Sequence, residues 1–246
     1  MNLFGSLRVA VQFLTRIPVG RQTTTDARTI GHSLLFYPLV GLLIGVLLFV
    51  LNMILSGTAP LLRAALLLTA WVLITGALHL DGLADSADAW LGGLGDRERA
   101  LAIMKDPYCG PAGVVTLVIV LIVKFAALSS FGLTTRPADL LIAPLLGRSM
   151  VPLLFLTTPY VRPGGLGAAL ATHMPRRAIV VVLLVTLAVV LWLLDVQRAY
   201  VMVVPLIAFF LLRRLMLQRL GGTTGDTAGA LVEITEMLTL VVLCMS

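Results

Sequence analysis

The first long apolar segment of the chain occupies residues 34–55 and reads LLFYPLVGLLIGVLLFVLNMIL. It contains no charged residue and matches the ~20 residues that an α-helix needs to cross the hydrocarbon core of a bilayer. Similar segments follow at roughly 61–80, 112–131, 138–157, 178–194, 199–217 and 227–245. The sequence therefore predicts about seven transmembrane helices.

The composition of the whole chain agrees with this interpretation. Of its 246 residues, 59% are hydrophobic and 12% are charged, and the mean hydropathy is +1.03. Soluble domains carry about 25% charged residues, so a water-soluble globular protein is excluded. The gaps between apolar segments are short. We therefore expect an all-α, polytopic membrane helix bundle that forms one domain over residues 1–246.

The basic residues indicate topology rather than a nucleic-acid partner. The net charge is +6 and the isoelectric point is about 10.0, and membrane proteins concentrate Arg and Lys in cytoplasmic loops. If the N-terminus is cytoplasmic, the basic residues outside the predicted spans all fall on the cytoplasmic side except Arg63, Arg136 and Arg198. Lys124 and Arg148 fall inside predicted spans, with no acid obviously placed to pair with them. Arg148 is expected to face a polar site, with snorkelling to the membrane surface as the alternative.

The N-terminal segment has the pattern of an amphipathic helix. Leu3, Leu7, Val11 and Leu14 recur along one helical face, together with Phe4. We expect an interfacial helix that lies along the membrane surface.

Acidic residues are scarce and clustered. The chain has twelve Asp and Glu. Nine of them fall in two windows that the predicted topology puts on the cytoplasmic side: Asp81, Asp85, Asp88, Asp96, Glu98 and Asp106, and then Asp226, Glu233 and Glu236.

The first window follows the second predicted span. If that helix continues, Asp81, Asp85 and Asp88 stand at i, i+4 and i+7 on one face. Like charges so close together need a compensating cation, and an all-oxygen ligand set suits Mg²⁺ or Mn²⁺. The alternative is a solvated acidic helix end without metal. His79 points to the opposite side of a regular helix and is as consistent with packing as with catalysis.

Two further segments have features of a phosphate site. Lys105 precedes a turn rich in Pro and Gly that leads into the third span, where free backbone N–H groups can hold phosphate oxygens; a plain loop is the alternative. At the start of the seventh span, Asp226 and Glu233 flank a smooth patch that contains Gly229. A phosphate or metal fits there, whereas the alternative makes Asp226 an N-cap and Gly229 a packing contact.

These features favour phosphoryl transfer at the membrane. In such reactions metal ions neutralise developing charge, and an acidic residue takes a proton from the attacking hydroxyl. A P-loop lysine motif is absent from the sequence, so an activated pyrophosphate is a better donor candidate than ATP in a P-loop.

Four motifs carry a resemblance to a known family. They are QFLTRIPV at 12–19, HLDGLADSAD at 79–88, MKD at 104–106 followed by Gly110 and Gly113, and TGDTAGA at 224–230. Together, in this order and over nearly the whole chain, they resemble the cobalamin synthases, which are adenosylcobinamide-GDP ribazoletransferases.

The resemblance implies an Mg²⁺-dependent enzyme of the bacterial inner membrane whose active site faces the cytoplasm. It implies transfer of the phosphocobinamide group from adenosylcobinamide-GDP to α-ribazole or its 5′-phosphate, with release of GMP. Small-molecule substrates and membrane lipids are the expected partners, and a homo-oligomer remains open.

The resemblance also gives expected roles to individual residues. Asp81 and Asp85 are expected to hold Mg²⁺, and Asp226 and Glu233 to complete the metal site. Asp88 is expected to act as the base or as a further ligand, with Asp85 as the second catalytic candidate. The candidates for substrate or phosphate contacts are Arg16, His79, Lys105, Asp106, Arg148 and Gly225.

Two other functions compete with this one. CDP-alcohol phosphotransferases share the mechanism and are loosely similar, but position 78 is Leu where their pattern has Asp. A cation-coupled or proton-coupled transporter predicts acids near the bilayer centre and an internal repeat. Most acids here cluster at one edge instead, and no repeat is visible.

Overall fold

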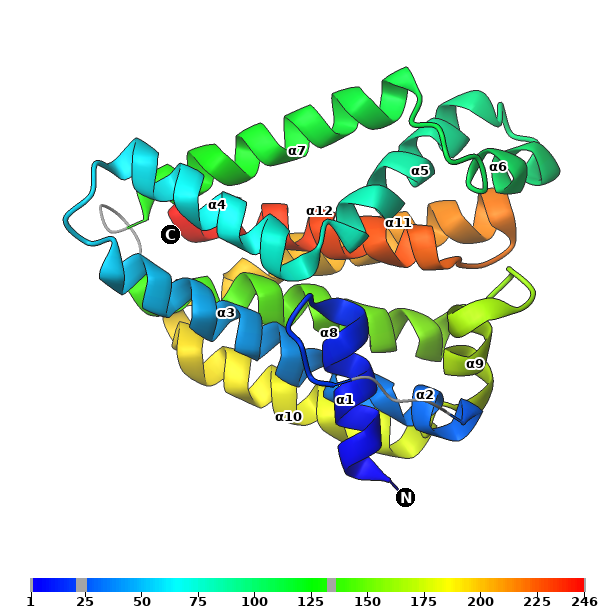
Figure 1. Ribbon diagram of the computed structural model, residues 1–246, viewed down its shortest axis with the longest axis horizontal. Helices are drawn as coiled ribbons and strands as arrows, with labels where there is room; N and C mark the ends of the chain where they lie inside the picture. The colour runs from blue at the N-terminus through cyan, green and yellow to red at the C-terminus, as the bar shows by residue number, and fades with distance from the viewer. Residues whose placement is uncertain (1, 21–25, 132–135, 246) are drawn as a thin grey trace.

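The computed structural model describes residues 2–20, 26–131 and 136–245, which form an all-helical bundle (Figure 1). The predicted fold class is confirmed. The described residues include no strand, although Tyr160 and Thr223 form an isolated bridge. The α-helices are α1 (Leu3–Leu14), α2 (Ala27–Ser33), α3 (Tyr37–Ile54), α4 (Pro60–Thr75), α5 (Leu78–Gly92), α6 (Arg97–Ile103), α7 (Pro111–Ser130), α8 (Ile142–Thr157), α9 (Gly165–His173), α10 (Arg176–Leu194), α11 (Val203–Leu220) and α12 (Gly225–Cys244). The 3-10 helices are η1 (Leu34–Phe36), η2 (Pro137–Leu141) and η3 (Val196–Met202).

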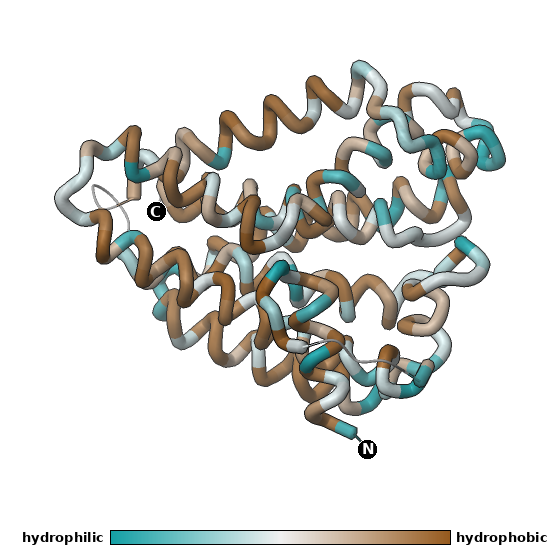
Figure 2. The backbone as a smooth tube through the Cα atoms, in the orientation of Figure 1, coloured by the Kyte–Doolittle hydropathy of each residue, from teal (hydrophilic) through white to brown (hydrophobic). Residues whose placement is uncertain are grey.

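Six segments of the described chain are long and apolar enough to cross a membrane. Figure 2 shows the hydrophobic residues along these helices. Helices α10 and α11 expose apolar side chains over much of their length, as lipid-facing helices do. The six segments are Ala27–Ile54, Pro111–Ser130, Pro137–Thr157, Arg176–Leu194, Gln197–Leu220 and Gly225–Cys244.

The second predicted span differs from the expectation of one continuous helix. It is a pair, α4 and α5, whose axes meet at 87°. Gly76 and Ala77 both adopt the left-handed conformation, with φ of 62° and 57°, and this ends α4 and redirects the chain. The backbone N–H of Arg16 donates to the carbonyl of Ile74 (2.7 Å), which satisfies one of the carbonyls at the end of α4. The acidic window therefore lies on a separate helix.

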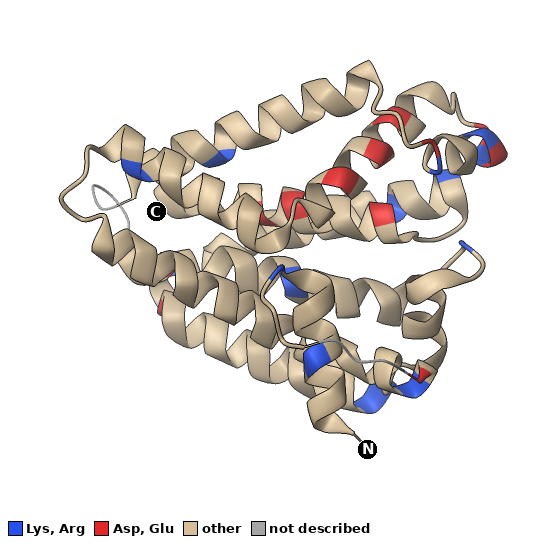
Figure 3. Ribbon diagram, in the orientation of Figure 1, with Lys and Arg blue, Asp and Glu red and all other residues tan. Residues whose placement is uncertain are grey.

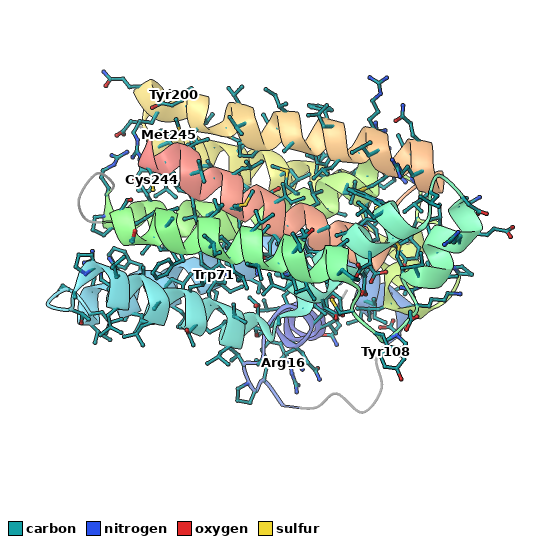
Figure 4. All side chains as sticks on the ribbon, turned by 90° about the horizontal axis from the view of Figure 1, so that it is seen from above. Arg16, Trp71, Tyr108, Tyr200, Cys244 and Met245 are labelled. Atoms are coloured by element: carbon teal, nitrogen blue, oxygen red, sulfur yellow. The ribbon has the colours of Figure 1, made fainter. Side chains whose placement is uncertain are left out.

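The bundle has two ends that differ in composition. Helix α6, helix α9 and the α11–α12 connection lie at one end, which we call the α6 end (Figure 1). The α3–α4 connection and the C-terminus lie at the other. Figure 4 shows Tyr108 at the α6 end and Tyr200 and Met245 at the opposite end.

Helix α12 lies at the centre of the bundle and packs against α5, α7, α8 and α11. Its side chains Leu231, Val232 and Leu240 are fully buried. This central position explains why α12 can bring its N-terminal residues against α5.

The N-terminal helix α1 is confirmed as a helix, and it packs on α2 and α3. Its predicted apolar face is divided between two environments. Val11 and Leu14 are buried in the bundle, whereas Leu3 and Phe4 remain exposed. Exposed apolar side chains at the start of such a helix suit insertion into the membrane interface.

Candidate active site

The acidic face of α5 keeps the predicted spacing. Asp81, Asp85 and Asp88 occupy i, i+4 and i+7 of this helix, with Asp81 exposed and the other two half-buried. Figure 3 shows acidic residues along α5 and near the beginning of α12. The opposite face of α5 buries Leu83 and Ser86. The amphipathic pattern of α5 therefore leaves its carboxylates on the open side of the helix.

The start of α12 is capped by threonines rather than by Asp226. The side chain of Thr224 accepts a hydrogen bond from the backbone N–H of Thr227 (3.2 Å), and the Thr227 hydroxyl accepts one from the backbone of Thr224 (2.9 Å). This reciprocal arrangement is a capping box. Asp226 lies in the first turn and does not cap the helix, so its carboxylate is available for other contacts.

Two glycines allow α5 and α12 to approach closely. A Cβ atom on Gly82 of α5 would lie 2.7 Å from the backbone oxygen of Asp226, and one on Gly229 of α12 would lie 3.3 Å from the Cα of His79. A side chain at position 82 would push the helices apart. These two glycines thus allow the two acidic windows to lie against each other.

The two windows line one cavity of about 170 Å³. His79 and Asp81 from α5 face Gly225 and Asp226 from α12 across it, and aromatic and aliphatic side chains from α1, α3 and α8 complete the wall. His79 and Asp81 share the cavity although a regular helix puts them on different sides. Asp85 lies close enough to Asp81, Asp88 and Asp226 to interact electrostatically with all three.

A cation from a distant loop pairs with Asp226, which lines this cavity. Nη1 of Arg162 lies 2.9 Å from Oδ2 of Asp226, and its Nη2 contacts the carbonyl of Met104 (3.5 Å). The loop is fixed by two backbone hydrogen bonds, from Val161 N–H to the carbonyl of Thr223 (3.0 Å) and from Thr223 N–H to the carbonyl of Pro159 (2.8 Å). Arg162 therefore offsets part of the negative charge of the acids.

The carboxylates of this site provide only part of a metal shell. Within the described residues, no three His, Cys, Asp or Glu side chains lie close enough to hold an ion together. Mg²⁺ in phosphoryl-transfer sites is commonly bound by one or two protein carboxylates, with water and substrate phosphates as the other ligands. The hard oxygen atoms of Asp81 and Asp226, beside one cavity, fit that mode of binding.

The model of the cobalamin-5-phosphate synthase family matches residues 6–244 of the chain. The chain belongs to this family. A curated relative from Pseudomonas paraeruginosa (strain PA7) is 57% identical over 240 residues, which cover 98% of both chains. One from Pseudomonas fluorescens (strain Pf0-1) is 56% identical over 239 residues, covering 97% of this chain and 98% of its own. A third, from Pseudomonas putida (strain KT2440), is 58% identical over 229 residues and covers 93% and 94% of the two chains.

All three relatives bear the name adenosylcobinamide-GDP ribazoletransferase. No solved structure has a significant match to the chain.

In this member of the cobalamin-5-phosphate synthase family, Asp88 holds the start of α7. Its Oδ2 accepts from Gly110 N–H (2.7 Å) and its Oδ1 from Gly113 N–H (2.9 Å). Both carboxylate oxygens are therefore engaged by backbone donors at a helix N-terminus, where a negative charge is favourable. This placement favours Asp85 over Asp88 as a proton acceptor.

The neighbouring cysteine does not offer a thiolate. Cys109 lies on the exposed segment before α7, with its Sγ 3.9 Å from Oδ2 of Asp88. Desolvation, together with the carboxylates of Asp88 and Asp85, raises the pKa of the Cys109 thiol. The thiol stays protonated at neutral pH, which argues against nucleophilic catalysis by this residue.

Lys124 and Arg148 have acidic partners, contrary to the expectation from the sequence. Nζ of Lys124 lies 2.9 Å from Glu233 and 2.7 Å from Glu236, and Arg148 contacts Glu236. All four side chains are buried. Nη2 of Arg148 also lies 3.4 Å from Nδ1 of His79. Buried charges require such pairing.

The buried cluster separates two predicted site residues from the cavity. Neither Glu233 nor Arg148 lines it, whereas His79 belongs to both the cluster and the cavity wall. The geometry gives Glu233 a cation partner away from Asp81 and Asp226. Its expected role as a metal ligand has no support from its position.

Of the predicted substrate-binding or phosphate-binding residues, His79 and Gly225 line the cavity. Arg16, Lys105 and Asp106 lie around it and not in its wall. Arg16 is exposed and packs over Gly76 at the α4–α5 break, two residues after Leu14, which lines the cavity. Lys105 and Asp106 are exposed after α6. The preceding residue, Met104, contacts both Arg162 and Thr224. The Lys105 segment thus lies beside the start of α12.

Arg162 is the site residue that sequence reasoning missed. From the sequence, Arg162 was interpreted only as one of the basic residues that indicate the membrane topology. A signal was present in the surrounding segment TTPYVRPGGLG at 157–167, a short loop rich in Pro and Gly that holds a single cation. Such loops commonly carry binding residues.

Proposed function

We propose that the chain is an adenosylcobinamide-GDP ribazoletransferase. The observation that carries this proposal is that Asp81 and Asp226 line one cavity, with Arg162 paired to Asp226, in a member of the cobalamin-5-phosphate synthase family. Carboxylates and a guanidinium at a common site are the groups that phosphoryl transfer from a pyrophosphate requires. The names of the similar Pseudomonas proteins supply the substrates.

The proposed reaction breaks the phosphoanhydride bond of the donor and forms a phosphodiester bond. A ribose hydroxyl of α-ribazole, or of its 5′-phosphate, attacks the phosphorus that bears the cobinamide. A new P–O bond forms to the ribose oxygen, and the bond between this phosphorus and the bridging oxygen breaks. GMP leaves with that oxygen and its electron pair, and the hydroxyl proton passes to a carboxylate.

Asp85 is the proposed acceptor of this proton. It is half-buried on the same face of α5 as Asp81, and among the described residues no backbone donor engages its carboxylate in the way that Gly110 and Gly113 engage Asp88. Partial burial of this carboxyl, and then the neighbouring carboxylates of Asp81 and Asp226, favour its protonated form after transfer. General base catalysis of this kind contributes about 10²–10⁴-fold to a rate.

Asp81 and Asp226 are the proposed protein ligands of Mg²⁺. A bound divalent ion would neutralise charge that develops on the pyrophosphate oxygens. Arg162 would hold phosphate oxygens from the opposite side, exchanging its contact with Asp226 for a bidentate contact with substrate. Lys105 and Arg16, on the rim, would attract the polyanionic substrate.

We further propose that the α6 end faces the cytoplasm of a bacterial cell and that the bundle lies in the inner membrane. Arg97, Arg99, Lys105, Arg176 and Arg177 belong to segments at this end. The excess of cations there follows the positive-inside rule. Nucleotide-linked substrates would then reach the cavity from the cytoplasm.

The test uses the full-length protein reconstituted in liposomes with Mg²⁺, adenosylcobinamide-GDP and α-ribazole 5′-phosphate. We expect one GMP to be released for each adenosylcobalamin 5′-phosphate formed, with no release when either substrate is omitted or when EDTA removes Mg²⁺. GMP release without the joined product, or no release with both substrates, contradicts the proposal.

A further inference from the structure

A second cavity lies outside the candidate active site. Helices α8, α10 and α11, with η3, line an open apolar cavity of about 640 Å³ that shares no lining residue with the cavity at Asp81. Its walls include Met150, Leu153, Leu183 and Leu206. It lies along helices that are long and apolar enough to cross a membrane, so lipid chains are its natural surroundings.

The end of this cavity nearest the α6 end is basic. Arg176 and Arg177, the first residues of α10, line it there. Nη2 of Arg176 donates to the carbonyl of Leu156 (2.9 Å), which holds the guanidinium at the rim. A polar cavity of about 370 Å³ adjoins the apolar one, and both are lined by Leu156, Thr157 and Arg176.

A third arginine approaches the same rim. Nη2 of Arg213 on α11 donates to the carbonyl of Thr157, the residue common to both cavities. Its Nε is buried and has no hydrogen-bond partner within the part of the chain that the structure describes. A buried donor without an acceptor is costly, so an external acceptor would stabilise this arrangement.

The positive charge at this rim has no counterpart in the described chain. At the opposite end of the same helices, Arg136 pairs with Asp195 and Arg198 pairs with Asp139. No described carboxylate lies within ion-pair distance of Arg176, Arg177 or Arg213. Two cations also begin α10, where the helix dipole disfavours positive charge and favours an anion.

We propose that this is a binding site for one anionic phospholipid, such as phosphatidylglycerol. An acyl chain fills the apolar cavity between α8, α10 and α11, and the headgroup phosphate binds Arg176 and Arg177. A free phosphate ion gains nothing from the apolar walls, and a zwitterionic lipid compensates the arginines less well. Only an anionic lipid uses both halves of the site.

The proposal is tested by native mass spectrometry of the full-length protein in detergent. The protein is titrated with phosphatidylglycerol or with phosphatidylcholine of the same acyl chains. We expect wild type to bind the first phosphatidylglycerol at least about tenfold more tightly than phosphatidylcholine. Each arginine near a lipid surface contributes about fivefold to affinity. Arg177→Gln should therefore weaken phosphatidylglycerol binding about fivefold, and the double variant Arg176→Gln/Arg177→Gln about 30-fold.

Two further variants make the test specific. Arg99→Gln removes an exposed positive charge on α6 and should leave lipid binding unchanged. Leu184→Trp fills the apolar cavity at a side chain that is already 61% exposed, so the fold tolerates it, and it should weaken phosphatidylglycerol binding without any change in charge. Equal affinity for the two lipids, an equal loss in Arg99→Gln, or unchanged binding by Leu184→Trp would overturn the proposal.

Discussion

Arg162 and Asp226 form an ion pair across 64 residues of sequence, with Nη1 and Oδ2 2.9 Å apart. The pair joins the loop after α8 to the first turn of α12, beside the carboxylates of α5. It gives the acidic site a cation and places a guanidinium beside the proposed pyrophosphate site. The pair is partly exposed, so its contribution to stability is small, and its main role is expected in substrate binding.

The first prediction concerns Arg162. Arg162→Gln should lower kcat about 100-fold or more, because a guanidinium that stabilises transferring phosphate oxygens is lost. Arg162→Lys should recover only part of the activity, since an ammonium cannot bind two oxygens in the same fork. Steady-state GMP release measures both variants, with Arg99→Gln as the control. Wild-type kcat in Arg162→Gln would show that the ion pair is only structural.

Asp88 offers a test that separates a structural role from a catalytic one. Asp88→Ala removes the acceptor for the N–H groups of Gly110 and Gly113, and loss of such a cap costs about 1–2 kcal/mol of stability. We expect a lower melting temperature with kcat reduced by less than tenfold at low temperature. A loss of about 1,000-fold at unchanged melting temperature would instead identify Asp88 as the base.

The buried charge cluster predicts a compensating pair of substitutions. Lys124→Met leaves Glu233 and Glu236 without their shared cation, and breaking a buried ion pair costs about 3–5 kcal/mol. Adding Glu233→Gln removes the surplus charge, so the double variant should be more stable than Lys124→Met alone. Thermal unfolding in detergent measures which of the two variants is more stable. A double variant less stable than the single one would show that charge balance does not control this cluster.

The contact between α5 and α12 predicts sensitivity at one glycine. A Cβ on Gly82 would lie 2.7 Å from the backbone oxygen of Asp226, whereas one on Gly57 meets no atom within 4 Å. Gly82→Ala should cost about 1–3 kcal/mol through overpacking and should lower GMP release by displacing Asp226. Gly57→Ala is the matched control and should behave as wild type. If the two variants are indistinguishable, the close approach of the helices does not shape the site.

The sequence predicted the helical class, the apolar spans and the acidic face of α5, because these depend on local periodicity. It did not predict the break between α4 and α5. Gly76 supplies a turn signal, but Ala77 also adopts a left-handed conformation that its residue type disfavours. The apolar pattern of the segment does not reveal this break.

Local sequence patterns also could not predict which charged residues pair with one another. Lys124 and Glu233 are 109 residues apart, and their contact depends on how α7 packs against α12. The sequence therefore assigned Glu233 to the metal site and left Lys124 without a partner. By contrast, the predicted topology put both acidic windows at the same end of their spans, and Asp81 and Asp226 do line one cavity.

The most direct test of the account compares Asp81→Asn, Asp226→Asn and the double variant in the reconstituted GMP-release assay. Residues that act as one unit have non-additive effects. Each single substitution should lower kcat about 100-fold or more. The kcat of the double variant should be less than about tenfold below that of the less active single variant. Asp195→Asn, at the opposite end of the bundle, should retain wild-type activity. Near-normal activity of either single variant, or losses that multiply in the double variant, would contradict a single site built from α5 and α12.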